Sequence, residues 1–134
     1  MNEIDVAEVS ITLAQTTGQA AALGYEDWTY GVSTRVKTAP GVSTWDCFSY
    51  RDDDGTIVDV FDHKAIGKAA KTATRQLLEA QGDECTGVKC TVARSGQFRI
   101  EYSFDFDESI RWANPFFSKL TDEEVIENVR PRDF

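Results

Sequence analysis

The sequence is poor in the side chains and motifs on which most enzymes depend. Its 134 residues include a single histidine, His63, so no pair of histidines with metal-binding spacing exists. The glycine patterns GxGxxG and GxxxxGKS/T, whose backbone amides hold phosphates, are absent, and so is the nucleophile motif GxSxG. We therefore predict that the protein is not an enzyme and that it needs no cofactor.

Cysteine is scarce as well, and its number is odd. Cys47, Cys85 and Cys90 cannot all pair within one chain, which is typical of reduced thiols in a cytoplasm. Four residues separate Cys85 from Cys90, where a zinc knuckle typically has two, and the chain has no second cysteine pair. We expect three buried, unreactive thiols and no metal site.

Long apolar runs and an excess of basic residues are also missing. No uninterrupted apolar run approaches the roughly 20 residues that a membrane-spanning helix needs. The first ten residues carry acids where a signal peptide carries bases. The net charge of -9 repels the phosphates of nucleic acids and anionic membranes. We expect a cytoplasmic protein without nucleic-acid or membrane partners, for which a basic protein is a compatible partner.

What the sequence does contain is a regular alternation of apolar and polar residues. A period near 3.6 predicts helices and a period of two predicts strands. Gly24 and Gly82 are typical helix ends, whereas Asp54-Gly55 and Ser95-Gly96 are typical hairpin turns. The pattern predicts, in order, a helix in residues 1–23, strands at 28–37, 42–51 and 56–60, a helix at 64–81, strands at 88–92 and 98–106, and a short helix from Thr121 that ends before Pro131.

These elements predict a fold class. Short turns join the strands within each group, so the sheet should be largely antiparallel. We predict a single α+β domain over residues 1–134, with a five-stranded sheet, helices on one face and the element order α-βββ-α-ββ-α.

The strand predicted at 98–106 has the clearest alternation in the chain. Phe98, Tyr102, Phe104 and Phe106 share one side of it with Ile100, and we expect these four aromatic rings to be buried in the core. Asp105 then lies on the polar side of the same strand.

Acidic residues gather in three places. The first, Asp52-Asp53-Asp54-Gly55, looks like a calcium loop. With Gly55 at the sixth position, however, the first and twelfth ligand positions fall on Tyr50 and Phe61, so we interpret the segment as a solvated turn. The second group is Asp105, Asp107 and Glu108 after the last strand. The third is Asp122, Glu123 and Glu124, which follow Thr121 in a capping-box pattern.

Several residues together resemble a known family. They are Trp28 at the first strand, the turn Asp54-Gly55, the turn Ser95-Gly96 with Phe98, and the run of residues 100–105. In these and in element order the chain resembles the YezG-like immunity proteins of bacterial polymorphic-toxin systems. The resemblance implies a small protein that binds a cognate toxin domain, of basic nuclease or deaminase type, and occludes its active site. Acidic side chains would then mimic the phosphates of the toxin's substrate.

Such an interface needs apolar or aromatic side chains at its centre and charges at its rim. Trp45 and Trp112 do not fit a clean buried face, so we expect them to be exposed. The candidate partner-binding residues are Trp45, Asp52, Asp53, Asp54, Asp105, Asp107, Glu108, Trp112, Asp122, Glu123 and Glu124.

Two other functions fit the same sequence. A chaperone or adaptor of a secreted effector is also small and acidic, and it would bind its effector without inhibiting it. A small enzyme would use Asp105, Asp107 or Glu108 for acid–base chemistry, which requires that one carboxyl lose contact with water.

Overall fold

The computed structural model describes residues 5–24, 28–51, 56–59, 64–113 and 119–129. Its strands form one antiparallel sheet in the order β3-β2-β1-β4-β5. The elements are α1 (Val6–Gly24), β1 (Tyr30–Ala39), β2 (Val42–Arg51), β3 (Thr56–Asp59), α2 (Lys64–Ala80), β4 (Gly87–Ala93), β5 (Phe98–Ser103), α3 (Phe106–Ser109), the 3-10 helix η1 (Ile110–Trp112) and α5 (Asp122–Val129). No helix in these ranges is long and apolar enough to cross a membrane.

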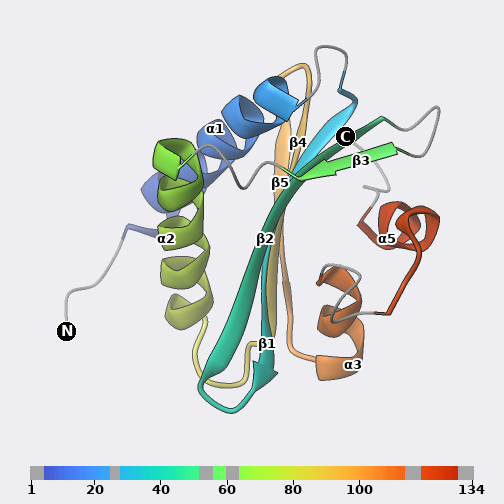
Figure 1. Ribbon diagram of the computed structural model, residues 1–134. Coiled ribbons are helices and arrows are strands. Elements are labelled where there is room, and N and C mark those ends of the chain that lie inside the picture. Colours follow the sequence, from blue (N-terminus) through green and yellow to red (C-terminus); the bar gives the residue numbers. More distant parts are fainter. Residues whose placement is uncertain (1–4, 25–27, 52–55, 60–63, 114–118, 130–134) are drawn as a thin grey trace.

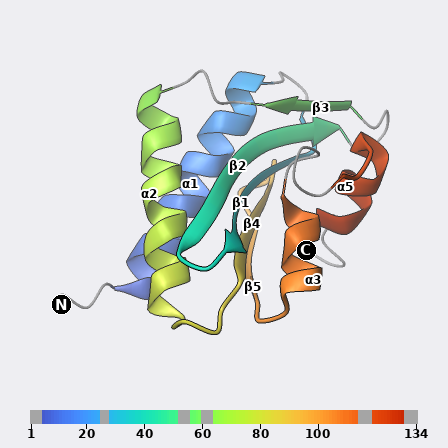
Figure 2. The same ribbon diagram turned by 60° about the horizontal axis from the view of Figure 1, so that its bottom comes forward.

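Helices cover both faces of the sheet. Figure 1 shows α1 and α2 side by side on one face and α3 and α5 on the other, and Figure 2 shows the same three layers from a second direction. The strands β2, β1, β4 and β5 form the body of the sheet, and β3 pairs only with the last residues of β2. The architecture is α+β, with the sheet as the middle layer.

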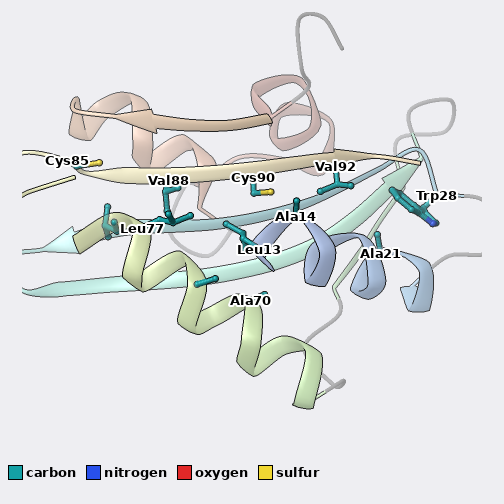
Figure 3. Close-up of a cluster of buried hydrophobic side chains, with 12 residues drawn as sticks. Leu13, Ala14, Ala21, Trp28, Ala70, Leu77, Cys85, Val88, Cys90 and Val92 are labelled. Atoms are coloured by element: carbon teal, nitrogen blue, oxygen red, sulfur yellow. The ribbon is translucent and has the colours of Figure 1, made fainter. Parts of the chain in front are cut away.

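The core under α1 and α2 is built from small and aliphatic side chains. Leu13 from α1 and Leu77 from α2 point toward Val88 and Cys90 of β4, as Figure 3 shows. Each of these four residues is fully buried. Burial of a leucine side chain stabilises the fold by about 1.5–3 kcal/mol, so this cluster holds the two long helices against the sheet.

The opposite face carries a second core. Val32 and Val36 of β1 lie beside Phe48 and Tyr50 of β2, and Trp112 packs on this cluster from η1. The helix α5 closes it with Val125, Ile126 and Val129, which are all buried. The C-terminal layer is therefore an integral part of the domain.

This arrangement corrects the fold that the sequence predicted. We expected helices on one face only, and α3, η1 and α5 cover the other. The order also differs, since α3 and η1 stand between β5 and the last helix. The reason is that one face of β1 carries polar residues, which the alternation pattern assigned to solvent, although helices cover that face. Ser33 shares a hydrogen bond of 2.8 Å with Thr17 of α1, and the Arg35 side chain donates to Thr74 of α2 at 3.1 Å.

The last strand is also shorter than predicted. β5 ends at Ser103, and the chain turns into α3 at Phe106. Of the four aromatic rings expected in the core, only Tyr102 packs against it. Phe98, Phe104 and Phe106 are 42%, 59% and 46% exposed. The alternation continued past the point where the backbone leaves the sheet, so it placed Phe104 and Phe106 wrongly.

Two glycines test this packing. A Cβ at Gly31 would lie 2.7 Å from the Cβ of Ala21, so Gly31→Ala should push α1 off β1 and destabilise the fold by about 1–3 kcal/mol. A Cβ at Gly67 of α2 would lie 3.5 Å from Trp45, an ordinary contact, and Gly67→Ala should stabilise by about 0.5–1 kcal/mol. Urea denaturation of the two variants measures both effects. Equal stability of Gly31→Ala and the natural protein would contradict the close approach of α1 to β1.

Candidate functional site

The turn from β5 into α3 is the most distinctive surface of the described chain. It consists of Phe104, Asp105, Phe106, Asp107 and Glu108, all exposed, and we name it the β5–α3 surface. Two phenylalanine rings reach solvent here between three carboxylates. Large exposed apolar side chains that are ringed by charge are typical of protein-binding surfaces.

Hydrogen bonds fix the backbone of this turn. The side chain of Asp105 accepts from the backbone N–H of Asp107 at 2.9 Å and of Glu108 at 3.4 Å, so Asp105 is the N-cap of α3. Its own backbone N–H donates to the Ser103 hydroxyl at 3.2 Å, and that hydroxyl donates to the Asp105 carbonyl at 3.1 Å. Because these bonds hold the backbone on both sides, Phe104 and Phe106 are displayed on a rigid support.

The segment behind the turn is anchored to the sheet. Ser109 and Trp112 are buried and lie over Gly87 of β4, where a Cβ would stand 2.8 Å from Ser109 and 3.3 Å from the Trp112 ring. The ammonium of Lys89 lies 4.8 Å from the centre of the Trp112 ring and 3.5 Å from a Glu101 oxygen. Burial lowers the pKa of Lys89, and the nearby carboxylates of Glu101 and Glu108 act against that shift.

A second group of acids lies on the same side of the molecule. Asp122, Glu123 and Glu124 form the exposed first turn of α5, which lies beside α3 on the face away from α1 and α2 (Figure 2). The predicted capping box is present: the Thr121 hydroxyl accepts from the Glu124 N–H at 3.2 Å, and the Thr121 N–H donates to Glu124 Oε1 at 3.1 Å. These bonds from Thr121 lower the pKa of Glu124.

The structure thus places six of the predicted contact residues on one face, and it places Trp45 and Trp112 elsewhere. Asp105, Asp107, Glu108 and the three acids of α5 share one face. Trp45 is partly buried on the opposite face, against α1 and α2, and Trp112 is 5% exposed in the core. The expectation that both tryptophans are exposed is wrong: Trp45 is only partly exposed, and Trp112 is buried as an anchor for η1. The segment Asp52, Asp53 and Asp54 lies outside the described residues.

The aromatic members of this site were missed, although the sequence holds a signal for them. Asp105-Phe106-Asp107-Glu108 has the same spacing as Thr121-Asp122-Glu123-Glu124: a capping residue with Glu three positions later. Applied at Asp105, the rule that found α5 would have ended the strand earlier and exposed Phe106.

Two grooves of the described residues lie on the face that α1 and α2 cover, away from the β5–α3 surface. One, of about 460 Å³, lies between α1 and α2 and is lined by residues that include Glu8 and Lys68. The other, of about 380 Å³, lies between α1 and the β4–β5 hairpin and is lined by residues that include Trp28 and Phe98. Within the described ranges, no three His, Cys, Asp or Glu side chains are placed to hold a metal ion.

The three thiols are buried and free, as the sequence predicted. Cys47 and Cys90 both pair with Ser33 of β1 in the sheet register, on the face beneath α1. Burial raises the pKa of Cys90 to about 12. Since the thiolate is the reactive form, Cys90 is chemically inert in the folded protein.

Cys90 gives the fold a defined response to alkaline pH. The folded state holds the thiol proton more tightly than the unfolded chain, whose value is 9.0, so the stabilisation is complete below pH 9 and is lost as pH rises toward 12. The total is roughly 4 kcal/mol at 1.36 kcal/mol per pH unit. Cys90→Ala removes this contribution, so the gap in unfolding free energy between the natural protein and the variant should narrow above pH 9. Urea denaturation at a series of pH values measures the gap, and a constant gap would contradict the burial of this thiol.

The chain was also compared with known proteins. It matches no protein-family model and no curated protein sequence. The resemblance to YezG-like immunity proteins therefore stays a prediction.

Proposed function

We propose that the protein is an immunity-type inhibitor that binds a basic toxin domain through the β5–α3 surface and covers its active site. The observation that supports this best is the pair of exposed rings, Phe104 and Phe106, set between the carboxylates of Asp105, Asp107 and Glu108. The resemblance in sequence pattern points to the same function.

The two rings have the properties of binding anchors. A phenylalanine that is half exposed gains about half of its transfer free energy only when a partner covers it. The turn that carries Phe104 and Phe106 is held by the Asp105 cap and the Ser103 hydroxyl, so little backbone ordering remains to be done on binding. Rigid aromatic side chains of this kind dominate the energetics of protein interfaces.

The acids around the rings select the partner by charge. With a net charge of -9, the protein attracts cationic proteins and accelerates their encounter. A toxin that acts on nucleic acid needs a basic active site, and the carboxylates of Asp107 and Glu108 would occupy the positions of the substrate phosphates. The inhibitor would act by steric occlusion in the cytoplasm of the producing cell.

The alternatives make different demands on the same surface. A chaperone or adaptor would use the anchors equally well, but its bound effector would stay active. An enzyme using Asp105, Asp107 or Glu108 would need a desolvated carboxyl, and all three are exposed. The exposed geometry therefore favours binding over catalysis.

Truncation of one anchor tests the proposal. Against the product of the neighbouring gene, taken as the candidate toxin, Phe104→Ala should weaken binding by about 30-fold or more, because anchor residues at interface centres contribute about 2 kcal/mol or more. Leu23→Ala is the matched control, since Leu23 is 51% exposed at the end of α1, which lies on the face of the sheet opposite α3 (Figure 1). Calorimetric titration gives both affinities, and growth rescue on co-expression gives inhibition.

Each outcome of this experiment has a defined meaning. Tight binding with an inhibited toxin, weakened only by Phe104→Ala, supports the proposal. A complex in which the toxin remains active would favour the chaperone or adaptor instead. Absence of a complex, or equal effects of the two substitutions, would refute the β5–α3 surface as the binding site. The association rate should also fall as salt rises, because the Debye length shrinks to about 10 Å at 0.1 M.

A further inference from the structure

We infer that the outer edge of β5 pairs with the same edge of a second copy of this chain, so that two sheets join into one. This inference does not depend on the proposed function. β5 is the last strand on its side of the sheet, and no strand of the described residues pairs with its outer edge. An open strand edge offers unpaired backbone N–H and C=O groups to another chain.

The sequence of β5 is self-complementary in an antiparallel sense. Read in either direction from Ile100, it runs to a charged residue and then to an aromatic ring, with Arg99 and Phe98 on one side and Glu101 and Tyr102 on the other. A two-fold axis through Ile100 places Arg99 opposite Glu101 of the second copy. It also places Phe98 opposite Tyr102 of the second copy. A two-fold interface requires such self-complementarity, because each contact occurs twice.

Of the neighbouring registers, only this one places Arg99 opposite Glu101 and so brings opposite charges together. A shift of the axis to Arg99 would oppose two arginines, and a shift to Glu101 would oppose two glutamates. A slip by a single residue would turn apolar side chains to the wrong face of the joined sheet. The Ile100-centred register therefore has two opposite-charge pairs and two aromatic pairs, both of which stabilise adjacent strands.

The contacts within one copy favour the same pairing. Glu101 lies opposite Lys89 in the β4–β5 register, and their side chains approach to 3.5 Å. Arg99 of the second copy would reach the same carboxylate from the other side, so charges would alternate along the row from Lys89 to Glu101 to that arginine.

The apolar side of the joint is already exposed. Phe98 is 42% exposed and Ile11 of α1 is 49% exposed, and both line the groove between α1 and the β4–β5 hairpin. In the joined sheet, α1 of both copies lies on the same face, because a two-fold axis perpendicular to the sheet keeps the faces together. The new Phe98–Tyr102 pairs would cover part of this apolar surface. Phe104 and the rest of the β5–α3 surface lie beyond the paired residues.

Charge exchange between two variants tests the register. Arg99→Glu alone opposes two acids and Glu101→Arg alone opposes two bases, so each should raise the dimer dissociation constant at least tenfold. An equimolar mixture of the two should restore the dimer, because both pairs regain opposite charges. Arg75→Glu makes the same charge change on the exposed side of α2, away from the β5 edge, and is the matched control. Sedimentation equilibrium over a concentration series measures all four samples, and thermal unfolding confirms that each variant folds.

A cross-link gives a readout that does not depend on the folding of Glu101→Arg. In the proposed dimer the two residues at position 100 face each other, within the Cα separation that a disulfide allows, about 4.4–6.8 Å. Ile100→Cys should therefore form a covalent dimer under mild oxidation, whereas Arg94→Cys should not. A natural protein that stays monomeric at every concentration, or a mixture that fails to restore the dimer, would overturn the inference. Equal cross-linking of the two cysteine variants would overturn it as well.

Discussion

The packing of Trp112 over Gly87 is the contact on which the second face of the sheet depends. Only a residue without a side chain leaves room there, since a Cβ would meet both Ser109 and the indole ring. The ammonium of Lys89 beneath the ring adds a cation–π contact in a buried setting, where such contacts are strongest. Through this anchor β4 fixes η1, and η1 fixes both α3 and α5. The positions of the acidic residues of α3 and α5 follow from it.

Local patterns in the sequence predicted the elements well and their assembly less well. The helix stripe of α2, the hairpin turn at Ser95-Gly96 and the capping box at Thr121 each depend on neighbours within four residues, and the structure contains all three. The coverage of both faces depends on partners far along the chain. Ser33 and Arg35 are polar because they form hydrogen bonds with Thr17 of α1 and Thr74 of α2. The sequence around β1 alone does not predict these distant partners.

The sequence also predicted only part of the candidate site. Its acids were found because charge is readable in any fold, but its aromatic anchors were assigned to the core. An alternating pattern does not report where the backbone leaves the sheet, and at Ser103 the departure is set by one hydroxyl and one cap. Trp112 was misplaced for the opposite reason: its environment is made by Gly87 and Lys89, residues of a different strand.

The Asp105 carboxylate caps α3 and is also one of the acids of the β5–α3 surface, and the first of these roles limits the second. Its Oδ1 atom already accepts hydrogen bonds from the N–H groups of Asp107 and Glu108, and these bonds fix the first turn of α3. A guanidinium that grips both oxygens would compete with these amides and loosen the helix, whereas a lysine ammonium needs only one oxygen. In the proposed complex, a lysine of the partner would therefore fit this position better than an arginine would.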